Sequence, residues 1–351
     1  MMAKTGTKKF SGGILPVDKP VGMTSHDVVD RARKILGVRK VGHTGTLDPQ
    51  ASGLLLLCVG GATRFAEYLT NQNKKYRAVI ELGVSTSTDD IEGQVLFKYG
   101  GDLETLVTEE RLKSALVSFT GTVQQVPPDY CSKKVDGVPA YVLARQGKKP
   151  DLKPVTVWID SISLLSFELP RVEIELGCSA GTYLRSLARD LGAQLGCGGH
   201  LASLVRTAIG DFTLEKAFTL DLLENAGAQK VGRSLLVPVE KALAMMPALI
   251  LSDKACEKIY FGQSVDLEGG EALQGEFPQE SCKARIYDRE NRFLGIGLIS
   301  PLGANTGTLS PKRLMVEAFR SSEEATDPPN SAGLTAEAKG CTRGLTERKL
   351  I

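Results

Sequence analysis

The composition of this chain is typical of a soluble globular protein. Of its 351 residues, 42% are hydrophobic and 24% are charged, and the formal net charge at pH 7 is +2. The length predicts more than one domain. No apolar run approaches the roughly 20 residues that would predict a membrane-spanning helix.

Two features of the sequence indicate a reducing compartment. Residues 1–13 are basic but lack the apolar core of a secretory signal, so we expect a flexible basic N-terminus there. The seven cysteines form no CxxC pair, and their odd number indicates reduced thiols. The sequence also has no nucleotide-binding loop. We therefore expect a cytoplasmic protein with no metal site and no cofactor.

The first part of the chain combines strands and helices. Alternating apolar residues predict strands at residues 14–17, 76–82, 155–167 and 171–177. Residues 93–97 are expected to be the partner of the 76–82 strand. Apolar residues at helical spacing predict helices at residues 25–36, 109–119 and 182–195. Suitable capping residues are Thr24 or Ser25 for the first helix, and Thr182 with Gly196 for the third.

The composition changes toward the end of the chain. From about residue 247 to residue 319, short strands and turns predominate, which predicts a small β-barrel-like module. Residues 320–351 are rich in Pro, Gly, Ser, Thr and charged residues. Because such a segment has too little apolar surface to fold, we expect a disordered tail.

One carboxylate lies on a loop whose backbone is constrained. The segment GHTGTLDPQASG, residues 42–53, places Asp48 before Pro49, and the apolar run 54–59 follows. Pro49 favours an extended backbone at Asp48, and the glycines allow close backbone approach. An Asp-Pro pair between glycines is most often an ordinary turn. A rigid loop that is followed by a buried strand nevertheless suits a positioned nucleophile or base.

Basic residues gather in a second segment, which contains few acidic residues. Tyrosines and prolines are interleaved with them, as is typical of a loop that folds over a polyanion. We expect this segment to bind RNA through Lys133, Lys134, Arg145, Lys148 and Lys149.

The Asp48 segment resembles, almost residue for residue, the catalytic motif of the TruB family of pseudouridine synthases. The resemblance extends through residues 15–25 and 127–134, where Cys131 and Ser132 replace the usual Ser-Ala. It implies isomerisation of uridine to pseudouridine at position 55, in the T-loop of transfer RNA (tRNA), by a monomer.

The resemblance also implies an architecture. The fold would be α+β, with a large mixed, mostly antiparallel sheet. A catalytic domain would span residues 14–245, with an RNA-clamping insert at about 124–153. Residues 246–319 would form an RNA-binding PUA-like domain, a type often attached to RNA-modifying enzymes.

Three residues are assigned to catalysis by this resemblance. Asp48 would attack the sugar or the base, or abstract a sugar proton. Arg185 would pair with it, and a fixed guanidinium keeps a carboxylate ionised and oriented. Tyr76 would stack on the target base and lie near its C5 atom. The target uridine must leave its stack to reach these groups.

Further residues are assigned to the substrate or the RNA. Tyr183 and Leu204 match a pocket tyrosine and a pocket-wall leucine of the family. His43 matches a histidine that takes space near the flipped nucleotide. Asp90 could complete an ion-pair network with the catalytic arginine. Lys19 lies in the opening motif, and we expect it to contact the RNA.

Two other functions stay open at this point. One is a guide-RNA-dependent pseudouridine synthase, whose family shares the GHxGTLDP core and would need partner proteins. The insert at 127–149 resembles a self-sufficient tRNA clamp and argues against that reading. The other is a non-catalytic RNA-binding or RNA-folding module. Binding alone does not need the carboxylate of Asp48, which favours retained chemistry.

Overall fold

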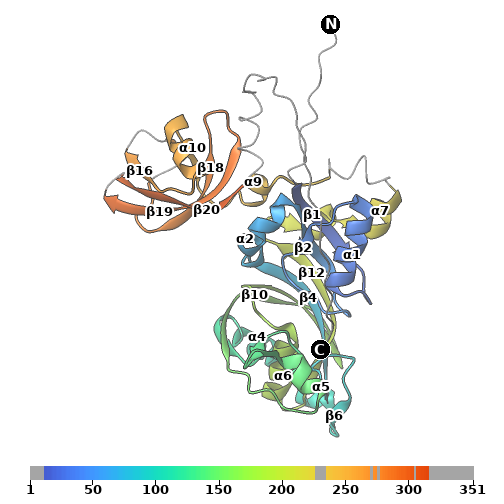
Figure 1. Cartoon of the computed structure of the whole chain (residues 1–351). Coiled ribbons are helices and arrows are strands. Elements are labelled where there is room, and N and C mark those ends of the chain that lie inside the picture. The colour runs from blue at the N-terminus through green and yellow to red at the C-terminus, as the bar shows by residue number, and fades with distance from the viewer. Residues whose placement is uncertain (1–11, 226–234, 269–271, 275–276, 304–305, 316–351) are drawn as a thin grey trace, which may run out of the picture.

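A computed structural model describes residues 12–225, 235–268, 272–274, 277–303 and 306–315 (Figure 1). The expected flexible N-terminus, apart from its last two residues, and all of the 320–351 tail lie outside these ranges.

A ten-stranded sheet forms the larger part of the molecule, in the order β14-β1-β3-β12-β4-β11-β10-β7, with β13 paired to β12 and β2 paired to β3. The β1·β14 and β12·β3 pairs are parallel, and the others are antiparallel. The expected α+β fold with a mixed, mostly antiparallel sheet is confirmed. The strands are β1 Gly12–Lys19, β2 Val41–His43, β3 Ser52–Gly60, β4 Lys74–Leu82, β7 Gly121–Gln125, β10 Val155–Glu168, β11 Arg171–Cys178, β12 Gly199–Ile209, β13 Phe212–Thr213 and β14 Phe218–Thr219.

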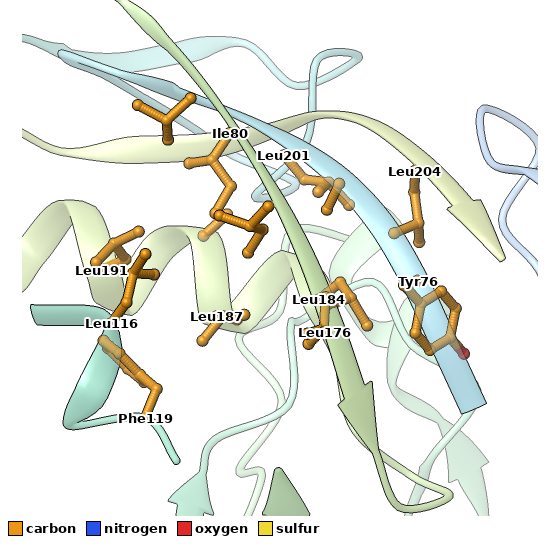
Figure 2. Packing of buried hydrophobic residues seen from close by; sticks show 14 of the residues in the cluster. Tyr76, Ile80, Leu116, Phe119, Leu176, Leu184, Leu187, Leu191, Leu201 and Leu204 are labelled. Carbon is orange, nitrogen blue, oxygen red and sulfur yellow. The ribbon is translucent and has the colours of Figure 1, made fainter. Parts of the chain in front are cut away.

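Helices lie against this sheet and in the segments that connect its strands (Figure 1). They are α1 Ser25–Leu36, α2 Ala66–Thr70, α3 Leu103–Leu106, α4 Glu109–Val117, α5 Ala140–Arg145, α6 Leu184–Leu195, α7 Leu220–Asn225 and α9 Val239–Ala242, with short 3₁₀ turns at Gly61–Phe65 and Leu214–Lys216. Helices α4 and α6 pack on one face of β4, β11 and β12, and Leu116, Leu187 and Leu191 interdigitate with Leu176 and Ile80 there (Figure 2).

A second, six-stranded sheet follows in the order β16-β20-β19-β18-β15-β17, with α10 Asp253–Tyr260 beside it (Figure 1). It is the small β-rich unit that the sequence predicts. Its strands are β15 Ala248–Ile250, β16 Val265–Glu268, β17 Ala272–Gln274, β18 Cys282–Tyr287, β19 Phe293–Gly303 and β20 Thr306–Leu314.

Local signals set several boundaries as predicted. Thr24 caps α1 through a capping box with Asp27, and Gly37 ends that helix in the left-handed conformation. Gly196 ends α6 in the same way, with φ of +77°.

Two local predictions were wrong. Residues 93–97 do not pair with β4, because both edges of β4 are occupied by β11 and β12. The strand there, β6 Val95–Lys98, pairs instead with β5 Val84–Thr86. Thr182 does not cap α6, because its hydroxyl donates to the carbonyl of Ser179. The N–H of Tyr183, the residue before α6, instead donates to the side chain of Gln125 at the end of β7, as described below.

Candidate active site

The Asp48 loop joins β2 to β3 and is held at several points. The N–H of Ala51 donates to the carbonyl of Asp48 at 3.1 Å and closes a turn. The Ser25 hydroxyl bonds both the N–H and the carbonyl of Leu47, at 2.8 and 3.1 Å. Gly53 adopts a φ of +98°, and a Cβ there would lie 2.4 Å from the carbonyl oxygen of Arg206. A glycine is therefore required at this position.

Lys19 holds the same loop through a hydrogen bond to the Pro49 carbonyl. Its side chain is fully buried, and Nζ donates to the carbonyls of Pro20, Met23 and Pro49 at 2.9, 2.6 and 3.3 Å. Burial lowers the pKa of Lys19, and the nearby Asp48 carboxylate opposes that shift. All three N–H donors of the ammonium face protein carbonyls, whereas a residue that contacts RNA would be expected to face solvent.

Arg185 lies at the first turn of α6 and points at Asp48. Its Nε lies 3.0 Å from Oδ2 of Asp48, and its Nη2 lies 3.4 Å from Oδ1. The arginine side chain is 9% exposed, whereas that of Asp48 is 45% exposed. The guanidinium thus contacts both carboxylate oxygens. The Asp48 side chain stays accessible to a substrate, as a reacting group must be.

The remaining donors of Arg185 are also used. Nη1 lies 3.7 Å from a carboxylate oxygen of Asp90 and donates to the carbonyl of Thr88 at 3.3 Å, and Nη2 donates to the carbonyl of Tyr130 at 3.0 Å. The Thr88 hydroxyl and the N–H of Glu92 bond the other oxygen of Asp90. The structure therefore brings Asp48, Asp90 and Arg185 into one network.

Tyr76 lies on β4 and is 7% exposed. Its ring packs near Leu176, Leu184 and Leu204, with the hydroxyl directed away from the centre of the core (Figure 2). Burial raises the pKa of Tyr76, and Arg206 on the adjacent strand lowers it.

A small hollow of about 20 Å³ opens beside Asp48. The side chain of Leu204, 9% exposed, contributes to its wall, as do Asp90 and Arg185. Asp48 therefore faces a space with both apolar and charged walls, which suits a planar, polar ring.

Tyr183 precedes α6 and is half-buried. Its backbone is fixed by Gln125 at the end of β7, whose side-chain oxygen accepts from the N–H of Tyr183 at 2.8 Å and whose Nε2 donates to its carbonyl at 2.9 Å. Burial, and then the Cys131 thiol, raise the pKa of the Tyr183 hydroxyl to about 12. This tyrosine is therefore a neutral phenol at physiological pH.

His43 ends β2 at the entrance to the Asp48 loop. Its Nδ1 accepts a hydrogen bond from the N–H of Gly45 at 3.3 Å. Burial, and then the charge of Arg206, lower the pKa of His43. The ring is therefore neutral, with its proton on Nε2.

The basic segment forms a short hairpin and a short helix next to the site. It contains the β8 Lys134–Val135 and β9 Val138–Pro139 hairpin followed by α5. Four of its five predicted basic residues are exposed, and Lys133 is partly buried. The Arg145 guanidinium lies 5.5 Å from the centre of the Tyr141 ring. The segment contacts the site through the Tyr130 carbonyl that accepts from Arg185.

Some residues of the site were missed at the sequence level. Gln125 is one, and Arg206, which is 1% exposed, is another. Arg206 interrupts an apolar strand, and that interruption is a signal that could have identified it. The ion pair of Arg189 with Asp89, at 3.0 Å, also supports the network beside Asp90.

Comparison with known proteins decides the family. Residues 33–184 match the model of the TruB family pseudouridylate synthase N-terminal domain. Residues 185–244 and 247–315 match two TruB C-terminal domain models. A tRNA pseudouridine synthase B of Burkholderia pseudomallei is 41% identical over 304 residues, which cover 87% of this chain and 97% of the relative. The chain belongs to the TruB family.

Other TruB family relatives are equally similar. The tRNA pseudouridine synthases B of Cupriavidus metallidurans and Thiobacillus denitrificans are each 41% identical over 86% of this chain. As a member of this family, the chain is a pseudouridine synthase, an isomerase.

Solved structures show the same fold. A Cbf5-Nop10-Gar1 complex contains a chain that is 27% identical, with a TM-score of 0.68 over 86% of this chain. An H/ACA ribonucleoprotein bound to a substrate RNA that contains 2'-deoxyuridine contains one that is 26% identical, with a TM-score of 0.67 over 87%.

The described residues contain neither a cluster of metal ligands nor a membrane-spanning helix. Within those ranges, no group of three or more His, Cys, Asp or Glu residues could hold a metal ion. No helix in the described ranges is long and apolar enough to cross a membrane.

Proposed function

We propose that this chain converts uridine to pseudouridine at position 55, in the T-loop of tRNA, with Asp48 as the catalytic carboxylate. The observation that carries this proposal is the pair of contacts between Arg185 and both oxygens of Asp48, at the edge of the hollow lined by Leu204. The names of the TruB family relatives support tRNA as the substrate.

The chemistry needs a carboxylate, a base-binding pocket and a group that accepts a proton. The N1–C1′ bond breaks, the uracil turns, and a C5–C1′ bond forms, so no electrons are gained or lost. Asp48 faces the hollow in which a flipped uridine would lie. Tyr76 would accept the C5 proton, and Leu204 and Tyr183 would bound the uracil. Lys133, Lys134, Arg145, Lys148 and Lys149 would contact the RNA backbone.

We further propose that the protein acts alone, as a cytoplasmic monomer. The similar chains in the H/ACA ribonucleoprotein and in the Cbf5-Nop10-Gar1 complex belong to assemblies, but they are 26–27% identical, against 41% for the tRNA pseudouridine synthases B. The proposed division into a catalytic domain at 14–245 and an RNA-binding PUA-like domain at 246–319 agrees with the two sheets.

The decisive experiment uses purified protein and unmodified tRNA, with nothing else added. Pseudouridine is mapped by carbodiimide labelling and primer extension. We expect one new stop, at the T-loop uridine. In Asp48→Asn, which keeps the shape of the side chain but loses its charge, we expect tRNA binding to be retained and the stop to be absent.

The matched control is Asp211→Asn, an exposed aspartate in the turn between β12 and β13. It should give the same stop as the wild-type protein. Full activity in Asp48→Asn would refute the catalytic assignment. Tight tRNA binding without product by the wild-type protein would favour the guide-dependent or the non-catalytic function.

A further inference from the structure

Arg206 lies in the middle of β12, between two segments that carry the proposed chemistry. In the sheet its register partners are Tyr76 of β4 and Gly53 of β3. Its side chain is among the largest fully buried ones in the described part of the molecule. A buried guanidinium needs partners for its donors, so its contacts indicate its role.

The guanidinium binds both ends of the Asp48 loop. Nε donates to the carbonyl of Leu54 at 2.7 Å, and Nη2 donates to the carbonyl of Gly45 at 3.2 Å. These carbonyls precede and follow Asp48 in the chain. The planar fork of an arginine presents a separate nitrogen to each of the two acceptors, whereas a lysine would have to reach both from one nitrogen.

The charge of Arg206 has no anionic partner nearby. Among the described residues, no carboxylate lies within 4.0 Å of this guanidinium. The strand register places Tyr76 of β4 opposite Arg206. Burial is the largest effect on the pKa of Tyr76 and raises it, and the Cys178 thiol of β11 and the Asp48 carboxylate act in the same direction, whereas the charge of Arg206 lowers it.

We propose that Arg206 is a positioning residue for the reaction. It holds the Asp48 loop against the strand that carries Tyr76, and its uncompensated charge favours the ionised Tyr76 hydroxyl as the acceptor of the C5 proton. This inference rests on the proposed function. The proton leaves C5 for the Tyr76 oxygen and passes to solvent, and N1 of the product takes up a proton, so no further reagent is consumed.

The first test is a double-mutant cycle with Arg206→Met, Tyr76→Phe and both together. It is measured as the single-turnover rate constant and the tRNA affinity. Arg206→Met should lower the rate constant by about 100-fold in the wild-type background, because it lowers the fraction of Tyr76 that is ionised and able to accept the proton. In the Tyr76→Phe background it should lower the rate constant much less, with tRNA affinity unchanged in both. Equal losses in the two backgrounds would overturn the proposal.

The second test does not depend on activity. Tyrosines are replaced by fluorotyrosine, whose more acidic phenol titrates in an accessible pH range, and the Tyr76 signal is assigned in the ¹⁹F NMR spectrum with Tyr76→Phe. Arg206→Met should raise the titration midpoint of Tyr76 by about one to three pH units. An unchanged midpoint would overturn the proposal. A wild-type protein that forms no pseudouridine would overturn the proposed function and leave this titration interpretable.

A conservative variant covers the case in which Arg206→Met does not fold. Arg206→Lys keeps the charge but has one nitrogen in place of the two that bind the carbonyls, so the midpoint should stay close to that of the wild-type protein while the rate constant falls. A midpoint that rises clearly above that of the wild-type protein would contradict the role of charge. The control is Arg171→Met, an exposed arginine that pairs with Glu81 on the same sheet, and neither measurement should change in it.

Discussion

At the scale of single residues, three buried cations lie on strands of the large sheet. Lys19, Lys74 and Arg206 are 0%, 7% and 1% exposed, and each donates to backbone carbonyls. A carbonyl satisfies a donor without neutralising its charge, so these side chains keep a positive potential beneath the site. Such a potential favours the negative charges that the proposed chemistry requires on Asp48 and Tyr76.

The free energy that burying a cation costs the folded protein can be measured at Lys74. Its Nζ donates to the carbonyls of Thr70 and Gln72 at 2.7 and 2.6 Å. Burial, and then the charge of Arg206, lower its pKa from 10.5 to about 8. Between these two values the unfolded chain binds more protons than the folded chain. The free energy of unfolding should therefore rise with pH in that range.

We predict that this rise depends on Lys74. The difference in unfolding free energy between the wild-type protein and Lys74→Met should change in favour of the wild type from pH 8 to pH 10.5. Urea denaturation at several pH values measures it. Lys75→Met, at an exposed neighbouring position, should show no such trend. A difference that does not change with pH would contradict the buried, partly neutral Lys74.

At the scale of elements, the insert and helix α6 meet at Arg185. The helix supplies the guanidinium, and the insert supplies the Tyr130 carbonyl that accepts from it at 3.0 Å. Gln125 fixes the start of the same helix from β7. The segment proposed to bind RNA is thus directly connected to Arg185, although four of its five basic residues are exposed.

This arrangement separates binding from chemistry in the insert. Lys148→Ala and Lys149→Ala should each weaken tRNA binding and lower the slope of log K against log salt by about 1. The rate constant at saturating tRNA should stay at the wild-type value, because neither side chain contacts the network around Arg185. Binding titrations at several salt concentrations and single-turnover kinetics measure the two effects.

The control for the insert variants is Lys113→Ala. It removes the same charge from α4, where Lys113 pairs with Glu109 at 2.6 Å. A salt slope that falls equally in this variant would show that net charge, and not the insert, sets the affinity.

At the scale of the whole molecule, the two sheets share a hydrophobic core. Phe293 of β19 packs on Phe65, with ring centres 5.7 Å apart, and the same cluster includes Leu54 and Leu56 of β3. An ion pair of Arg313 with Glu67, at 3.1 Å, lies beside it. The second sheet is therefore packed against the large sheet through apolar contacts as well as joined to it by the chain.

We predict that Phe293→Ala destabilises the whole protein by about 3–5 kcal/mol, because it removes a buried ring that both sheets contact. Differential scanning calorimetry should show a lower melting temperature, with the two sheets no longer unfolding in one transition. Leu302→Ala, on the same strand but 76% exposed, should melt like the wild-type protein. An unchanged melting temperature in Phe293→Ala would contradict the shared core.

The sequence by itself determined the features that depend on neighbouring residues. The cap of α1 at Thr24 and the end of α6 at Gly196 follow from side chains and φ angles within one turn of a helix. The Asp48 segment identified the family because a contiguous run of residues builds that loop. The mixed sheet followed from the same resemblance, and the small β-rich unit followed from the short strands and turns after residue 247.

Only the tertiary structure decided which distant residues meet. Arg185 reaches Asp48 across 137 residues of sequence; the family resemblance implied this pair, but residue spacing along the chain does not specify its geometry. The setting of Lys19, the pairing of β6 with β5 and the capping of Tyr183 by Gln125 were not predicted for the same reason. Arg206 became recognisable only when strand register placed it opposite Tyr76 and Gly53. Register is fixed by packing of the whole sheet, and this is information that no local pattern carries.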